Sequence, residues 1–368
     1  MASRFTFVFL LITLLTVSSF AQQHRIRVGV AGLTHGHVGW ILAAKDRPDL
    51  EVVGIAEPNK ELAQKLTKQH GISMDIVFDS LEEMLEATKP EAVTAFGNIY
   101  DHLSVVEACA PRGIHVMVEK PLAVSVAHAK KMKELATEHK IHLITNYETT
   151  WYPSTFKAHE LVEEGEVGDL RKMVIRDGHR GPKKIGVGAE FLEWLTDPKL
   201  NGGGAIIDFG CYGANLTTWF HNGKKPLSVT AVTQQLQPEN NPKVDDEATI
   251  ILNYENSQSI IQASWNWPIG RKDMEIYGLT GVIYADNPTQ LRVRVAEGYS
   301  DYAEENFKLE YQNSPFEDPF TLFLAVINGD VDLEEYALPS LENNMIVVEI
   351  LEAAVESAKT GKTVYLDN

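Results

Sequence analysis

A glycine-rich turn near residue 30 has the composition of a phosphate-binding loop. The strand-like run at residues 26–31 leads into Gly32-Leu33-Thr34-His35-Gly36-His37 and then into a helix-like segment. In such a unit the amides at the helix start face the pyrophosphate of a dinucleotide. The candidate cofactor residues are therefore Gly29, Gly32, Thr34, His35 and Gly36. The fingerprint is incomplete, because Thr34 and His37 replace its second and third glycines, and a purely structural turn is the alternative.

An acidic residue follows the next strand-like run. Glu57 ends the segment 51–57 and stands 25 residues after Gly32. A carboxylate at this place accepts a hydrogen bond from the adenosine 2′-hydroxyl of NAD and repels the 2′-phosphate of NADP. An ordinary acid at a strand end is the alternative. Turn and acid together indicate NAD as the cofactor and disfavour NADP.

Polar residues also follow two later strand-like runs. Asn98 and His102 come after the run at 92–96, and Glu119 and Lys120 come after the run at 116–118. Open α/β sheets bind ligands at the carboxyl ends of their strands, so all four are cofactor candidates. The proline after Lys120 favours an extended backbone there. A positive nicotinamide ring would lower the pKa of the lysine, which then exchanges a proton with a substrate hydroxyl.

With its later motifs the chain resembles the Gfo/Idh/MocA family of NAD(P)-dependent oxidoreductases. Glu119-Lys120-Pro121 lies about ninety residues after the glycine turn, and Gly202-Gly203-Gly204 precedes Asp208. Other matching segments are 151–153, 164–168, 244–248, 264–268 and 356–362. The resemblance implies that Lys120 is catalytic and that Asp208 works with it.

The family pattern implies a histidine four residues after the aspartate, where this chain has Tyr212. On a helix, Asp208 and Tyr212 share one face. A phenol is a proton donor, particularly where Lys120 lowers its pKa. We therefore expect Asp208 to orient Lys120 and Tyr212 to hydrogen-bond the reacting oxygen. A simple helix-start acid is the alternative for Asp208.

Further side chains are candidates for contact with the substrate, besides Lys120, Asp208 and Tyr212. They are Tyr152, His179, Arg180 and Trp265. A surface pair is the alternative for His179 and Arg180, and a core or subunit contact is the alternative for Trp265. His35 and His37 stand close together, but the sequence shows no matching ligands, so no metal site is expected.

The first 21 residues read as a secretory signal peptide. Arg4 precedes an apolar run at 5–17, and Ala21 ends a small-residue cleavage pattern. The run of about 13 residues is short for a membrane-spanning helix, which needs about 20. The segment predicts export to the periplasm or the cell exterior, with no membrane attachment after cleavage. The net charge of −18 argues against a nucleic-acid partner.

The remaining chain predicts two domains and an α/β fold class. Strands alternate with helices over 22–150, which indicates a doubly wound Rossmann domain with a parallel sheet. Successive strand-like runs within 151–368 indicate an α+β domain with a large, mostly antiparallel open sheet. A helix at 344–359, ending at Gly361, is expected to pack back on the first domain. The resemblance implies a homodimer or homotetramer.

The leading interpretation is an NAD-dependent oxidoreductase that moves hydride between the cofactor and a hydroxyl or keto carbon of a sugar, polyol or sugar derivative. One alternative is redox-neutral cleavage of glycosides with tightly bound NAD, which would release an aglycone without net NADH. A second alternative is a non-catalytic sugar- or nucleotide-binding protein, which the incomplete glycine fingerprint favours and Lys120 with Asp208 opposes.

Overall fold

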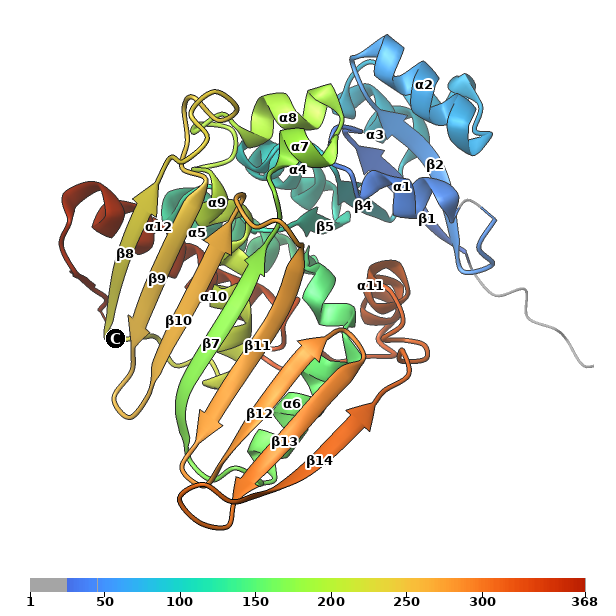
Figure 1. Cartoon of the computed structure of the whole chain (residues 1–368). Coiled ribbons are helices and arrows are strands. Elements are labelled where there is room, and N and C mark those ends of the chain that lie inside the picture. Colours follow the sequence, from blue (N-terminus) through green and yellow to red (C-terminus); the bar gives the residue numbers. More distant parts are fainter. Residues whose placement is uncertain (1–24, 45, 368) are drawn as a thin grey trace, which may run out of the picture.

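The computed structural model describes residues 25–44 and 46–367, so the predicted signal peptide at 1–21 lies outside the described residues. Two sheets, each with its own helices, form the molecule (Figure 1). Residues of both parts line a cavity. The predicted α/β fold class is confirmed, with a parallel first sheet and a mostly antiparallel second sheet.

The first sheet has six parallel strands in the order β3-β2-β1-β4-β5-β6. Its strands are β1 (Ile26–Ala31), β2 (Leu50–Ala56), β3 (Val77–Phe78), β4 (Ala92–Ala95), β5 (His115–Glu119) and β6 (Leu143–Asn146). The helices between them are α1 (Val38–Ala43), α2 (Lys60–His70), α3 (Leu81–Thr88), α4 (His102–Cys109) and α5 (Val126–His139). Strand order reverses between β1 and β4, and this switch point is where doubly wound sheets bind dinucleotides.

The second sheet has nine strands in the order β14-β13-β12-β11-β7-β10-β9-β8-β15, and only β7 and β10 pair in parallel. Its strands are β7 (Leu170–Gly178), β8 (Ser228–Gln234), β9 (Glu247–Asn253), β10 (Gln258–Ser264), β11 (Arg271–Gly278), β12 (Gly281–Asn287), β13 (Gln290–Ala296), β14 (Tyr302–Lys308) and β15 (Val364–Tyr365). Buried and half-buried residues alternate along β9 and β10, because only one face is covered.

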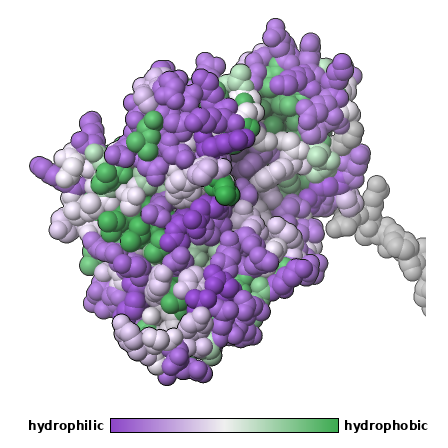
Figure 2. Space-filling view, in the orientation of Figure 1, coloured by the Kyte–Doolittle hydropathy of each residue, from purple (hydrophilic) through white to green (hydrophobic). Residues whose placement is uncertain are grey.

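Helices α6 (Pro153–Glu163), α9 (Ala205–Asp208), α10 (Gly210–Phe220) and α12 (Leu341–Thr360) pack against the inner face of this sheet. The other helices of this part of the chain are α7 (Pro182–Ile185), α8 (Ala189–Leu195) and α11 (Pro319–Asn328). Figure 2 shows the opposite face, with hydrophobic patches over β8 to β10 on a largely hydrophilic surface.

Two C-terminal helices tie the domains together. α12 ends at Gly361, whose positive φ of 66° suits the cap position. Met345 and Val348 of α12 belong to the same hydrophobic core as α4 and α5 of the first domain. Phe320 and Phe323 of α11 pack into the core around β1. Within the described ranges, no helix is both long enough and apolar enough to cross a membrane.

Candidate active site

A cavity of about 520 Å³ lies between the two domains, at the carboxyl end of β5. Both domains contribute charged and polar side chains to its wall. They include His35, His37, Lys120, Glu148, Tyr152, Asp177, His179, Asp208, Tyr212 and Lys272. The structure therefore brings most of the predicted catalytic and substrate residues together, although they come from distant segments.

Lys120 and Asp208 form a buried ion pair in this cavity. The Lys120 Nζ lies 2.5 Å from Asp208 Oδ1 and donates a second hydrogen bond, of 2.9 Å, to the Asp208 carbonyl oxygen. The Trp265 Nε1 donates to the other carboxylate oxygen at 2.9 Å. Burial alone would lower the pKa of Lys120, but the Asp208 carboxylate outweighs it and raises this pKa. Without a nicotinamide charge nearby, the lysine is thus an ammonium at neutral pH.

The local chain path explains the position of Asp208. This residue ends α9, whose first turn is held by the Asp245 carboxylate, which accepts hydrogen bonds from Gly204 N and Ile206 N at 2.8 Å each. Gly204 must lack a side chain, because a Cβ would lie 1.8 Å from the Asp245 carbonyl oxygen. The glycine run therefore lets the backbone approach closely and delivers Asp208 to Lys120.

Tyr212 lies beside the pair, but not as expected. Its ring centroid is 5.1 Å from the Lys120 Nζ and 4.4 Å from the Lys272 Nζ, so the aromatic ring contacts both ammonium groups. Burial raises the pKa of Tyr212 well above its ordinary value. The expectation that Lys120 lowers this pKa is therefore wrong, because desolvation and nearby carboxylates dominate.

Several charged residues in the cavity wall were not predicted, among them Lys272, Glu148 and Asp177. Lys272 Nζ contacts Glu148 Oε2 at 2.5 Å, and the Tyr152 hydroxyl donates to Glu148 Oε1 at 2.5 Å. Asp177, near the end of β7, is 2% exposed, and neither of its carboxylate oxygens has a hydrogen-bond partner among the described residues. Burial raises the pKa of Asp177 well above its ordinary value. Only the position of Asp177 near a strand end could have signalled its role.

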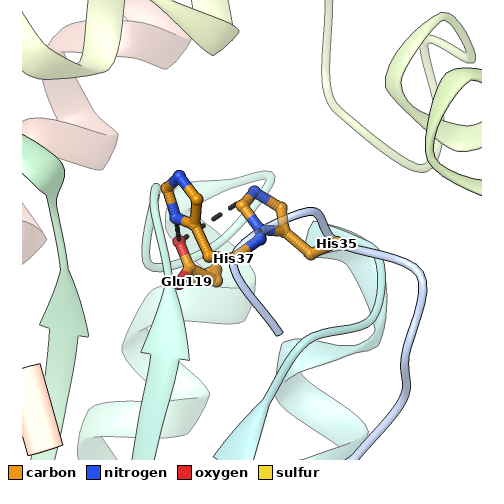
Figure 3. Close-up of side chains that lie close together, drawn as sticks. All are labelled: His35, His37 and Glu119. Carbon is orange, nitrogen blue, oxygen red and sulfur yellow. Dashed lines mark hydrogen bonds and ion pairs between the residues drawn. The ribbon is translucent and has the colours of Figure 1, made fainter. Parts of the chain in front are cut away.

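His35, His37 and Glu119 cluster at the edge of the cavity (Figure 3). Glu119 Oε2 lies 3.0 Å from His37 Nδ1 and 3.9 Å from His35 Nε2, so the structure supplies the third group that the sequence did not show. The backbone N–H of His37 donates to His35 Nδ1, which leaves the proton of neutral His35 on Nε2. A metal on that Nε2 would need the opposite tautomer. The contacts therefore describe a hydrogen-bond network.

Glu119 is charged within this network. Burial alone would raise its pKa, but His37, His35 and a hydrogen bond from the Asn146 amide lower the pKa to about 2. Burial lowers the pKa of His35 to about 3. Asn146 was not predicted as a site residue.

A second cavity, of about 260 Å³, lies at the switch point of the parallel sheet. It lies over the ends of β1, β2 and β4, and Gly32, Gly97, Asn98 and His102 line it. Gly32 has a φ of +80°, and a Cβ there would lie 2.9 Å from the Gly97 nitrogen. The His102 Nδ1 lies 3.1 Å from the Leu122 carbonyl oxygen, whereas its Nε2 has no partner in the described part of the chain. The glycine at positive φ allows a close backbone approach at this switch point, and the contacts of Asn98 and His102 with a cofactor stay a prediction.

Two predicted cofactor residues have structural roles. Glu57 is 3% exposed and accepts hydrogen bonds from Leu33 N and Asn59 N at 2.9 Å each, so it braces the turn. Burial raises its pKa, and its contact with a ribose stays a prediction. Gly29 lies inside β1, where a Cβ would meet the Met84 Cε at 2.6 Å. The structure gives Gly29 a packing role, and its contact with the cofactor stays a prediction.

Helix α8 of the second domain covers the glycine turn. The Trp194 Nε1 donates to Thr34 Oγ1 at 3.0 Å, and the Phe191 ring lies 4.8 Å from the His35 ring. Gly36 lines the cavity between the domains, next to Phe191.

Of the remaining substrate candidates, one lines the cavity and two do not. His179 lines the cavity, and its Nδ1 accepts from Gly181 N at 3.0 Å. Arg180 is exposed and does not line the cavity, so the structure does not bring it to the site. Trp265 is fully buried and lies outside the cavity wall. Its role as an aromatic wall is corrected to support of Asp208.

Comparisons with known proteins agree with this architecture. A family model described as "Oxidoreductase family, NAD-binding Rossmann fold" matches residues 26–147, and one described as "GFO/IDH/MocA C-terminal domain" matches residues 156–284. Trans-1,2-dihydrobenzene-1,2-diol dehydrogenase of Xenopus tropicalis is 25% identical, over 84% of this chain and 90% of the relative. D-xylose 1-dehydrogenase [NADP(+)] of Haloarcula marismortui is 21% identical, over 94% of this chain and 95% of the relative.

A solved structure of an inositol dehydrogenase homolog from Azotobacter vinelandii, complexed with NAD+, has a TM-score of 0.77. It is 18% identical and covers 93% of this chain and 97% of its own. At this identity the likeness concerns the fold, whereas the two family models between them span most of both domains. The chain belongs to the Gfo/Idh/MocA family of NAD-binding oxidoreductases.

Proposed function

We propose that the protein moves hydride between NAD and a hydroxyl-bearing or keto carbon of a sugar, polyol or sugar derivative. The observation that carries the proposal is the Lys120–Asp208 pair in the wall of the cavity between the domains. Relatives named for D-xylose and inositol support the substrate class. The wall is rich in charged and polar groups, which suits a ligand with several hydroxyls.

NAD, when bound, supplies the hydride acceptor; the protein residues handle the proton. The Lys120 ammonium, held by Asp208, donates a hydrogen bond to the reacting oxygen and protonates it when a carbonyl is reduced. In the oxidising direction, the hydroxyl proton moves to the lysine nitrogen after that nitrogen has released a proton. The Asp208 carboxylate then stabilises the ammonium that re-forms.

The proposal is tested by mixing purified protein and NAD with D-xylose, D-glucose, myo-inositol and methyl β-D-glucopyranoside. We expect the absorbance of NADH to rise with at least one of them. The variant Lys120→Met should lower the rate by about 100-fold or more. Lys243→Met, which changes an exposed lysine, is the control and should leave the rate unchanged. Turnover retained in Lys120→Met would contradict the role of Lys120.

We also propose that the protein is exported, on the strength of the N-terminal segment 1–21. Cell fractionation should place it outside the cytoplasm, and mass analysis of the mature chain should find Gln22 at its start. A full-length chain in the cytoplasm would contradict this.

A homodimer or homotetramer is proposed as well. The uncovered sheet face supports it, because this face exposes Val232 by 65% and carries the half-buried Ile251 and Ile260. Light scattering during gel filtration should give two or four times the monomer mass. Val232→Asp should lower the mass; a monomeric wild type would refute the proposal.

A further inference from the structure

A further hollow, which we call the outer hollow, adjoins the cavity between the domains. Its volume is about 520 Å³, and the residues that line it are Trp267, Pro268, Ile269, Arg271, Asp273 and Asp286. Arg271 and Asp286, which are both exposed, also line the cavity that contains Lys120. The two spaces therefore share part of their rim, and a ligand bound at Lys120 can extend past this rim into the outer hollow.

The indole ring of Trp267 forms a fixed apolar surface in the outer hollow. This residue lies in the loop between β10 and β11, and its backbone N–H donates to the His179 carbonyl oxygen at 3.1 Å. A Cβ on Gly178 would lie 2.8 Å from the Trp267 Cε3, so the ring packs directly on the backbone of Gly178, which lines the cavity between the domains. Ile269, in the same loop, is 78% exposed. The outer hollow thus contains two apolar side chains, one of them held in place by the cavity wall.

Paired charges line the rest of the outer hollow. The Arg271 guanidinium lies 5.8 Å from the centre of the Trp267 ring and donates two hydrogen bonds to the Asp273 carboxylate. Asp286 accepts two hydrogen bonds from the Arg292 guanidinium, of 2.6 and 2.8 Å. Because each carboxylate is paired with an arginine, the outer hollow suits an uncharged ligand. The carboxylate oxygens still have free lone pairs, which accept hydrogen bonds from hydroxyl groups.

We propose that the outer hollow binds a second pyranose ring, so that the substrate is a disaccharide whose reacting ring lies at Lys120. A pyranose has an apolar face of C–H groups, which packs on an aromatic ring, and an edge of hydroxyls, which bind polar and charged groups. A purely apolar group in the same place would take water from the charged side chains without replacing its hydrogen bonds. The inference rests on the proposed function, because that function places the reacting ring at Lys120.

The outer hollow would act on substrate choice through binding. Trp267 and Ile269 are not part of the wall that contains Lys120 and Asp208, so they take no part in moving the proton. Their contacts are made only by the second ring of a disaccharide, and a monosaccharide derivative does not reach them. The ratio of the affinities for a disaccharide and for a matched monosaccharide derivative therefore measures the outer hollow alone. General damage to the fold weakens both ligands and leaves this ratio unchanged.

The test is calorimetry of the purified protein with cellobiose, maltose, gentiobiose and methyl β-D-glucopyranoside, with NADH present so that no hydroxyl is oxidised during the titration. We expect at least one disaccharide to bind about tenfold more tightly than the methyl glucoside. Trp267→Ala, and Ile269→Glu in the exposed part of the loop, should each reduce this ratio to about threefold or less. Trp267→Phe keeps an aromatic ring and should retain most of the ratio. Tyr299→Ala, which removes another exposed aromatic side chain that lines neither space, is the control and should leave the ratio unchanged.

A ratio that Trp267→Ala loses and Trp267→Phe retains supports the second sugar site. A wild-type ratio near one for all three disaccharides overturns it, and so does a ratio that Trp267→Ala retains. A lower oligomeric mass of Ile269→Glu in gel filtration, with an unchanged ratio, also overturns it and assigns the outer hollow to a subunit contact. NADH formation from NAD and the same sugars tests the proposed function separately. Disaccharide preference without any NADH formation would refute that function and leave the second sugar site standing.

Discussion

Replacing Asp208 by asparagine should expose how strongly the buried ion pair shapes the site. In the wild type, Asp208 accepts from Lys120 on one oxygen and from Trp265 on the other. An asparagine has a single acceptor oxygen, so one of these donors would face an NH2 group. The Lys120 ammonium would also lose its counter-charge while it remains 7% exposed. We expect Asp208→Asn to lower the free energy of unfolding by about 3–5 kcal/mol.

A double-mutant cycle separates this charge effect from general damage. Asp208→Asn/Lys120→Met removes both charges, and such replacements of a buried pair are often nearly neutral. The double variant should therefore be more stable than Asp208→Asn by about 2 kcal/mol. Urea unfolding at neutral pH measures the change in the free energy of unfolding for each variant. The comparison requires that the variants have the same m-value, the dependence of this free energy on urea concentration. Lys243→Met, which removes only an exposed contact to Asp197, is the control and should change stability by less than about 1 kcal/mol.

The pH dependence follows from the two shifted pKa values. Burial alone would raise the pKa of Asp208, but the Lys120 ammonium outweighs burial and lowers this pKa. The stability that Asp208 contributes is therefore fully present above its ordinary pKa of 3.8, and it is lost as the pH falls through the folded-state pKa. The pKa of Lys120 is raised, so its contribution is present below 10.5 and is lost only at higher pH. The stability gap between wild type and Asp208→Asn should stay constant between about pH 5 and 9 and shrink in acid. The reasoning would be refuted if Asp208→Asn lowered the free energy of unfolding by less than about 1 kcal/mol. It would also be refuted if the effects of Asp208→Asn and Lys120→Met on this free energy were strictly additive in the double variant.

Three further variants probe the cofactor turn and the support of the site. Gly32→Ala should weaken NAD binding at least tenfold by calorimetry, because of its positive φ and close backbone contact, whereas Gly39→Ala, with open space around it, should not. Trp265→Phe leaves one oxygen of Asp208 unsatisfied and should cost about 1–3 kcal/mol in urea unfolding. Tyr212→Phe keeps the ring that contacts both ammonium groups, so the NADH formation rate should fall less than tenfold, and Tyr212→Leu should lose more.

Most of the fold could be predicted, because buried strands and amphipathic helices alternate plainly over the first domain. The exceptions have physical reasons. The strand β3, Val77–Phe78, is too short to show a period. The edge strand β14 is exposed or half-exposed throughout, so it has no apolar face for a pattern to reveal.

Some residues of the candidate site could be predicted from the sequence, and others could not. Lys120 and Asp208 could be found, because each sits in a contiguous motif whose local backbone delivers it. Asp177 and Lys272 could not, because their meeting depends on the register between β7 and β11, which no local pattern encodes. Trp265 follows the end of β10, where strand alternation no longer governs the direction of a side chain, so it turned out to be buried against Asp208. Site residues that lie in one contiguous motif can therefore be predicted from the sequence. Site residues that come together through the pairing of two strands can be identified only once the register of that pairing is known.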